Sequence, residues 1–122
     1  MKKAQLIDLA KKLDAAPTLT TALTEDVVAA VRQLWPDASV AMLDAKALYT
    51  TDHALHLVNQ MLPEWTISLD GVADDKMGDW TCSLRQSRVT DSDPYLGVGH
   101  AAKPAHAILA ALFAALASRV SG

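Results

Sequence analysis

Apolar residues recur at helical spacing through the first half of the chain. Residues 5–13 predict an amphipathic helix, and its apolar side carries Leu6, Ile7, Leu9, Ala10 and Leu13. A second helix is predicted to begin at Thr24, a hydroxyl N-cap followed by two acidic residues, and to end before Pro36. Its apolar face holds Val27, Val28, Val31, Leu34 and Trp35. Residues 36–48 give no clear periodicity, so their structure stays open.

A third helix is predicted between two sharp boundary signals. The run Thr50-Thr51-Asp52 is typical of an N-cap, and Pro63 ends the helical pattern. The side expected to face the core carries Ala54, Leu55, Val58, Met61 and Leu62. The opposite side is polar and carries His53, His56, Asn59 and Gln60.

Strict alternation then replaces the helical spacing, which indicates two strands. One face of the first strand holds Trp65, Ile67 and Leu69, and one face of the second holds Trp80, Cys82 and Leu84. The polar run 70–78 between them predicts a hairpin, with Trp65 and Trp80 as cross-strand neighbours on the buried face. Because a hairpin alone is barely stable, it requires a cover.

The cover is predicted to be a C-terminal helix that begins near Pro104. Its large apolar side carries Ile108, Leu109, Leu112, Phe113, Leu116 and Val120. The other side has no charge and carries Ala107, Ala110, Ala111, Ala114, Ala117 and Ser118. Since a surface helix would carry charges there, we expect a second cover. The N-terminal helices are the preferred cover, and the alternative is a homodimer through Ala107, Ala110, Ala114 and Ala117.

These elements predict one α+β domain spanning residues 1–122. A small antiparallel sheet of two or three strands packs with amphipathic helices, and the alanine-rich helix is central. Residues 1–48 form a helical N-terminal part, and residues 49–122 form a helix–hairpin–helix core.

Composition narrows the classes of function. The net charge is −3 and the eleven Lys and Arg residues are scattered, so nucleic acid is a poor default partner. The single cysteine, Cys82, excludes an intrachain disulfide and fits a reducing cytoplasm. The long uncharged run between Lys103 and Arg119 is shorter than the ~20 residues of a membrane span. We therefore expect a soluble, cytoplasmic protein.

No motif for catalysis or metal binding is complete. His53 and His56 share a helix face, but two imidazoles do not make a zinc site. The acids of residues 70–79 lack the spacing of a calcium loop. Residues 97–99, Gly-Val-Gly, lack the third glycine of a phosphate-binding loop, so they are interpreted as a tight turn between strand and helix. No catalytic residue, cofactor or metal is predicted, and the chain is not expected to be an enzyme.

The residues best suited to bind a partner protein are aromatic and charged side chains around the hairpin and the third helix. Tryptophan in particular is enriched at energetic hot spots of interfaces. The candidates are Trp65, Trp80, Asp74, Asp75, Arg85, Arg88, His53 and His56. For the two tryptophans, a place in the core is the main interpretation and a binding surface is the alternative.

The segment from Tyr49 to Val58, Tyr-Thr-Thr-Asp-His-Ala-Leu-His-Leu-Val, followed by Leu-Pro-Glu-Trp at residues 62–65, resembles the phage ABA sandwich family. Trp80, the Gly-Val-Gly stretch and the alanine-rich run from Pro104 fit the same resemblance, which covers roughly residues 49–119. It implies a phage or prophage origin and an α-β-α layering of the sheet with amphipathic helices. It implies no activity. Residues 34–46 and 70–78 depart from the family pattern.

These observations favour a small phage-encoded, non-enzymatic protein that acts by binding a host or phage protein. The sharpest version is an inhibitor of a host defence complex, such as an anti-CRISPR protein, in the cytoplasm of the host cell. The alternative is a virion-associated or structural module that forms homo-oligomers. An enzyme or metalloprotein is the least favoured hypothesis, and neither a membrane nor nucleic acid is expected as partner.

Overall fold

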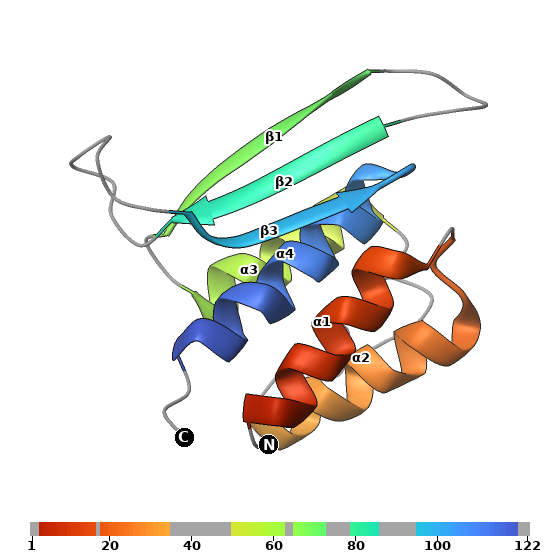
Figure 1. Ribbon diagram of the computed structural model, residues 1–122, viewed down its shortest axis with the longest axis vertical. Helices are drawn as coiled ribbons and strands as arrows, with labels where there is room; N and C mark the ends of the chain where they lie inside the picture. Colours follow the sequence, from red (N-terminus) through yellow and green to blue (C-terminus); the bar gives the residue numbers. More distant parts are fainter. Residues whose placement is uncertain are drawn as a thin grey trace.

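The computed structural model describes residues 3–16, 18–34, 50–62, 65–72, 79–85 and 95–119. In this part of the chain, four helices and a three-stranded antiparallel sheet form the predicted α+β fold (Figure 1). The elements are α1 (Lys3–Ala15), α2 (Thr21–Leu34), α3 (Thr51–Met61), β1 (Thr66–Val72), β2 (Asp79–Arg85), β3 (Tyr95–Ala101) and α4 (Pro104–Arg119). None of these helices is long and apolar enough to cross a membrane.

The sheet has β2 at its centre, with β1 and β3 antiparallel on either side. The predicted hairpin is confirmed, because Ile67 pairs with Leu84 and Leu69 pairs with Cys82. Directly opposite residues of an antiparallel pair point to the same face, so these four side chains share the inner face. The two strands are longer than the apolar alternation suggests, since the ladder continues to the pair of Val72 with Asp79.

The third strand corrects the interpretation of the glycines. Gly97 and Gly99 do not form a turn between strand and helix, because they lie inside β3, opposite Leu84 and Cys82. Both glycines are buried, and a Cβ atom added to either would lie within 3.0 Å of backbone atoms of α4. They therefore let the helix backbone approach the strand closely.

The alanine-rich helix α4 is central, as predicted. Figure 1 shows it directly below the sheet, with α1 and α3 beside it, and it packs against β3, β2, α1 and α3. Its large residues Ile108, Leu109, Leu112 and Phe113 are fully buried.

The alanine side of α4 is covered by this chain itself. Ala107, Ala110 and Ala117 are at most 4% exposed. Ala107 and Ala110 lie against the site of Gly99, which means that this side faces β3. The surface expected to hold a homodimer together is therefore internal packing, and only Ala114 among its four alanines is partly exposed.

The layering differs from the α-β-α order that the resemblance implies. The four described helices all lie on one face of the sheet (Figure 1). The sheet forms one outer layer, α4 with its neighbours lies beneath it, and α2 lies farthest from the sheet. The physical reason is the chemistry of the other sheet face, which carries mainly hydroxyl and charged side chains. These groups would lose hydrogen bonds to water if a helix covered them.

Helix α1 packs on α4, but the alanine side that the N-terminal helices were expected to cover faces β3 instead. Helix α1 buries Leu6, Leu9 and Leu13, which recur at helical spacing. Ile7, also assigned to the apolar side, is 37% exposed. The burial of three leucines on one stripe explains why this short helix is held in place.

Helix α2 begins one turn earlier than predicted. The Leu23 N–H donates to Thr20 Oγ1 at 3.2 Å, so Thr20 supplies the cap. Thr24 lies inside the helix, is fully buried, and donates its hydroxyl to the Thr21 carbonyl at 2.9 Å. The prediction of Thr24 as N-cap is therefore wrong, because an equivalent hydroxyl occurs four residues earlier. The predicted core residue Trp35 and residues 36–48 lie outside the described residues.

Helix α3 matches its predicted boundaries. The Thr50 hydroxyl accepts a hydrogen bond from the His53 N–H at 3.3 Å and caps the helix. Leu57, which the sequence pattern does not assign to the core, is 1% exposed, whereas Leu55 is half-buried.

Candidate functional site

One face of the sheet is not covered by any described helix. We call it the outer sheet face. It carries Thr66, Ser68 and Asp70 of β1, Thr81, Ser83 and Arg85 of β2, and Val98 and His100 of β3. These residues alternate with the inner-face residues along each strand, so their position follows directly from the register.

The side chains of the outer sheet face form rows across the three strands. Asp70, Thr81 and His100 lie opposite one another in one row. Ser68, Ser83 and Val98 form the next row, in which Val98 is 40% exposed. The face thus combines hydrogen-bonding hydroxyls, both signs of charge and one exposed apolar side chain. A sheet face of this kind suits contact with a protein better than the binding of a small molecule, which needs a concave site.

The two tryptophans do not form the predicted cross-strand pair. Trp80 lies opposite Gly71, whereas Trp65 precedes β1 at the other end of the hairpin. Their positions differ by six residues of register, which is about 20 Å along a strand. Both side chains are half-buried and pack against the core. The prediction is wrong because it did not fix the register, which depends on where the longer strands end.

The remaining candidate residues do not share one surface. Arg85 is half-buried on the outer sheet face. His53 and His56 are exposed on α3, which lies on the helical side of the sheet (Figure 1). Asp74, Asp75 and Arg88 lie outside the described residues. The structure therefore does not gather the described candidates into a single binding site.

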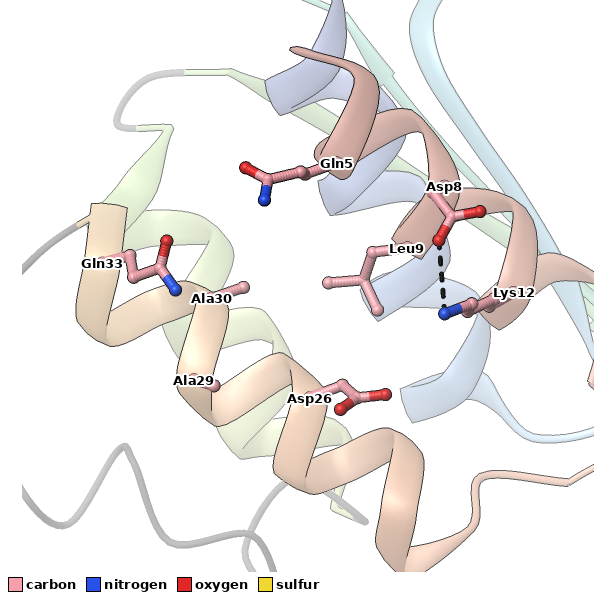
Figure 2. A pocket seen from close by; sticks show the side chains of 8 residues that line it. All are labelled: Gln5, Asp8, Leu9, Lys12, Asp26, Ala29, Ala30 and Gln33. Carbon is pink, nitrogen blue, oxygen red and sulfur yellow. Dashed lines mark ion pairs between the residues drawn. The ribbon is translucent and has the colours of Figure 1, made fainter. Parts of the chain in front are cut away.

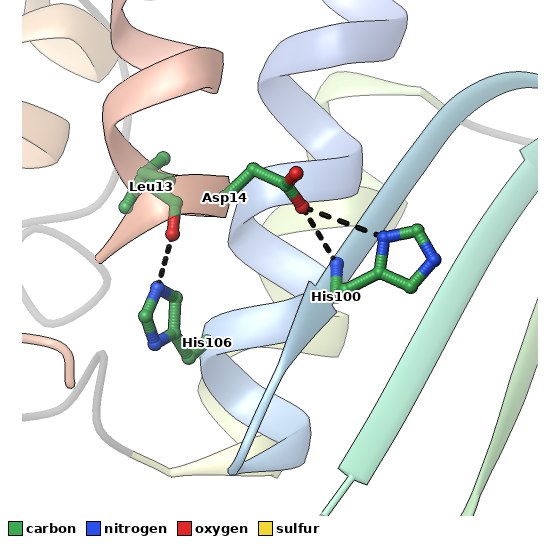
Figure 3. A network of polar contacts seen from close by, with 4 residues as sticks. All are labelled: Leu13, Asp14, His100 and His106. Carbon is green, nitrogen blue, oxygen red and sulfur yellow. Dashed lines mark hydrogen bonds and ion pairs between the residues drawn. The ribbon is translucent and has the colours of Figure 1, made fainter. Parts of the chain in front are cut away.

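The C-terminal end of α1 holds a polar network that the sequence analysis missed (Figure 3). The His100 N–H donates to Asp14 Oδ1 at 2.9 Å, and the His100 Nδ1 lies 3.6 Å from the same oxygen. His106 Nε2 donates to the carbonyl of Leu13. The partners are 86 and 93 residues apart in the sequence, so no local pattern indicates these contacts. The network joins α1 to β3 and α4.

The four histidines have separate surroundings. The His53 Nδ1 lies 2.6 Å from the Thr50 hydroxyl at the start of α3, while His100 and His106 bond to different groups of α1. His56 is exposed on α3. Within the described residues, no group of three or more His, Cys, Asp or Glu side chains could hold a metal ion.

Cys82 lies on the inner face of the central strand and is fully buried. Burial raises the pKa of its thiol from 9.0 to about 12, because the thiolate would lose its hydration. The thiolate is the reactive form, so this side chain is unsuited to nucleophilic catalysis at neutral pH.

We expect a thiol reagent such as dithionitrobenzoate to leave Cys82 unlabelled in the native protein at pH 8 and to label it stoichiometrically in guanidinium chloride. We also expect stability to fall above pH 9, since the unfolded thiol ionises there while the folded thiol keeps its proton up to about pH 12. The slope of this decline is at most about 1.4 kcal/mol per pH unit. Fast labelling under native conditions would contradict the buried position of Cys82. The Cys82→Ser variant has no thiol and is the negative control.

A shallow hollow of about 220 Å³ lies between α1 and α2 (Figure 2). It is lined by Gln5, Asp8, Leu9, Lys12, Asp26, Ala29, Ala30 and Gln33. The Lys12 Nζ forms an exposed ion pair with Asp8 at 3.2 Å. The lining contains no imidazole, thiol or hydroxyl side chain.

Comparison of the chain with known protein families, curated proteins and solved structures found no match.

Proposed function

We propose that this protein is a small, non-enzymatic interaction protein that binds a partner protein through its outer sheet face. The single observation that carries the proposal is that the four described helices cover only one face of the sheet. The other face presents side chains that can donate and accept hydrogen bonds in rows fixed by the strand register. Rigid strands hold these groups in place, which reduces the entropy that is lost on binding.

The size of the outer sheet face sets a condition on the complex. Three strands of seven residues give a surface of roughly 14 Å by 23 Å, or about 300 Å². A standard interface buries about 800 Å² on each partner. The partner must therefore also contact surfaces next to the sheet, or it must contact more than one copy of it.

The charged groups of the outer sheet face suggest the chemistry of the partner. Asp70 and His100 flank the hydroxyl of Thr81, and Arg85 lies at the end of β2 opposite Thr66. A complementary surface would offer a cation to Asp70. Such pairing fixes orientation and accelerates association more than it raises affinity.

The resemblance to the phage ABA sandwich family supports a sharper version of the proposal. In this version the protein is encoded by a phage or prophage and acts in the cytoplasm of the host cell. It occupies a surface of a host defence complex, as an anti-CRISPR protein does. A protein without catalytic groups can inhibit in this way, because blocking a surface requires contact area only.

The test is affinity capture from bacterial lysate with matched surface variants. We expect the tagged wild-type chain to recover a partner protein at equal molar ratio. Ser83→Arg places a long charged side chain at the centre of the outer sheet face and is expected to abolish recovery. Gln60→Arg places the same side chain at an exposed position of α3, on the helical side of the sheet, and is expected to leave recovery unchanged. Circular dichroism verifies that both variants fold. Recovery that is equal for the two variants, or no partner at all, would refute the proposal.

A further inference from the structure

The two edges of the sheet differ in how well they are protected against pairing with another strand. At β3, the N–H of His100 donates to the Asp14 carboxylate of α1, and the ladder contains an irregularity between Leu84 and Arg85. Both features hinder the addition of another strand. At β1, the described part of the chain adds no strand beyond the edge, and Figure 1 shows β1 at the margin of the sheet away from α1. The strand Thr66–Val72 contains no lysine or proline, the residues that commonly protect an edge.

The hydrogen bond of His100 also fixes which backbone groups face outward at β1. Because the His100 N–H points to Asp14, it points away from β2, so the pair of His100 with Thr81 has no ladder hydrogen bonds. Backbone groups alternate along a strand, so those of Thr81 point to β1, where Thr81 pairs with Asp70. The N–H and C=O groups of Asp70 thus point inward. Those of Ile67, Leu69 and Gly71 consequently point outward, at the edge that no described strand pairs with.

The inner face of β1 extends beyond the helical layer. Helix α4 packs against β3 and β2, and Cys82 and Leu84 of β2 are fully buried. Ile67 and Leu69 of β1 are only half-buried, although they lie on the same inner face. The half-buried side chains of Ile67 and Leu69, which we call the apolar ledge, therefore lie alongside the outward backbone groups of β1.

We propose that a second copy of this chain pairs with β1, antiparallel, about a twofold axis at Leu69. In this register Leu69 faces Leu69 of the second copy, and Ile67 faces Gly71 of the second copy. Outward backbone groups then meet outward backbone groups at three residue pairs, which gives about six hydrogen bonds at two for each pair. The two three-stranded sheets become one sheet of six strands, with the helices of both copies on the same face.

The side chains of β1 favour a second copy as the occupant, because they are complementary to themselves in this register. On the outer face, the Ser68 hydroxyl lies opposite the Asp70 carboxylate of the second copy and can donate to it. The two Asp70 carboxylates stand diagonally and not opposite each other. On the inner face, Ile67 lies opposite Gly71 of the second copy. Because glycine has no side chain, Ile67 has space to reach the Trp80 ring of the second copy, which lies against that glycine. The apolar ledges of the two copies thus cover each other.

The first experiment measures the mass of the purified full chain in solution by sedimentation equilibrium and light scattering between 1 and 200 µM, about the range in which weak dimers form. We expect the wild type to be a dimer. Leu69→Pro removes one outward N–H but no ladder bond, and Ile67→Lys puts a charge on the ledge, so we expect both to be folded monomers. Val98→Lys adds the same charge at an exposed site on β3 and should remain a dimer.

The second experiment tests the register by disulfide formation. Ser68→Cys and Asp70→Cys proteins are mixed in equal amounts and oxidised. We expect the mixture to form a disulfide-linked dimer at least tenfold faster than either protein alone, since residue 68 faces residue 70 of the second copy. Buried Cys82 does not compete. A wild-type monomer at 200 µM, a dimer that survives both edge variants, or a mixture that reacts no faster than its components would each overturn the proposal.

Discussion

Replacing Gly99 by alanine is expected to lower the free energy of unfolding by about 3 kcal/mol, and the same change at Gly97 should have a similar effect. An added Cβ at Gly99 would lie within 3.0 Å of the Ala107 carbonyl oxygen and the Ala111 backbone nitrogen. Backbone atoms of a helix cannot rotate away as the end of a flexible side chain can. Either α4 moves away from β3 along its length, or the strand leaves the ladder, and both changes loosen the contact between helix and strand.

The measurement is urea unfolding followed by tryptophan fluorescence, together with a thermal scan in which a loss of this size corresponds to roughly 10 °C in Tm. Val98→Ala is the matched control, because Val98 lies between the two glycines but points to the outer sheet face and is 40% exposed. We expect this control to cost less than about 1 kcal/mol. If Gly99→Ala were no more costly than Val98→Ala, the close approach of helix and strand would be disproved.

The same two glycines explain why β3 was not predictable from the sequence. A strand is recognised by alternating apolar side chains, and the inner positions 97 and 99 of β3 carry no side chain. Their packing partner is the backbone of α4, which has no signature of its own apart from alanines at matching positions. The alanine side of α4 and the glycines of β3 form one contact together. In the sequence, the alanine pattern and the glycine pattern each fit several structures when they are considered separately.

The elements that could be predicted are those whose signal is local. The leucines of α1, the Thr50 cap of α3 and the alternation around Cys82 each lie within about ten residues, and the structure confirms all three. The cap of α2 was placed wrongly because Thr20 and Thr24 both offer a hydroxyl before an apolar stripe. Only the tertiary position of the helix decides between them.

The candidate site could be predicted in part only. Alternation places Ser83 and Arg85 on the polar side of β2, but it does not reveal that no described helix covers this side. That depends on where α1 packs, and α1 packs on α4. The contacts of Asp14 and Leu13 with His100 and His106 join the two ends of the chain and have no counterpart in the local pattern.

The proposed pairing of β1 strands bears on the proposed function. Two copies joined at Leu69 would present one continuous outer sheet face of about twice the area, or roughly 600 Å². This value is closer to the about 800 Å² that a standard interface buries on each partner. The pairing also leaves the hydroxyl rows of Thr81 and Ser83 accessible in both copies. The two proposals are independent, since a monomer can still bind through the outer sheet face and a dimer can lack a partner.

His106→Ala is expected to destabilise the protein by about 3 kcal/mol. His106 is 2% exposed, and its Nε2 donates to the carbonyl of Leu13 in the last turn of α1. Because a carbonyl can only accept, the proton must reside on Nε2. The final carbonyls of a helix have no partner within the helix, so the imidazole satisfies a group that would otherwise be buried without a hydrogen bond. Alanine removes both this bond and the volume of the ring.

His106→Phe separates the two contributions, because phenylalanine keeps the ring volume and loses the donor. We expect it to cost less than His106→Ala, but at least about 1 kcal/mol, in urea unfolding. His56→Ala, at an exposed position of α3, is the control and should change stability by at most about 0.5 kcal/mol. Hydrogen exchange gives a second measurement, in which amides of α1 should lose protection in both His106 variants, since this contact ties the helix to α4. Unchanged protection of α1 in His106→Ala would mean that the buried leucines of α1 hold the helix without the imidazole.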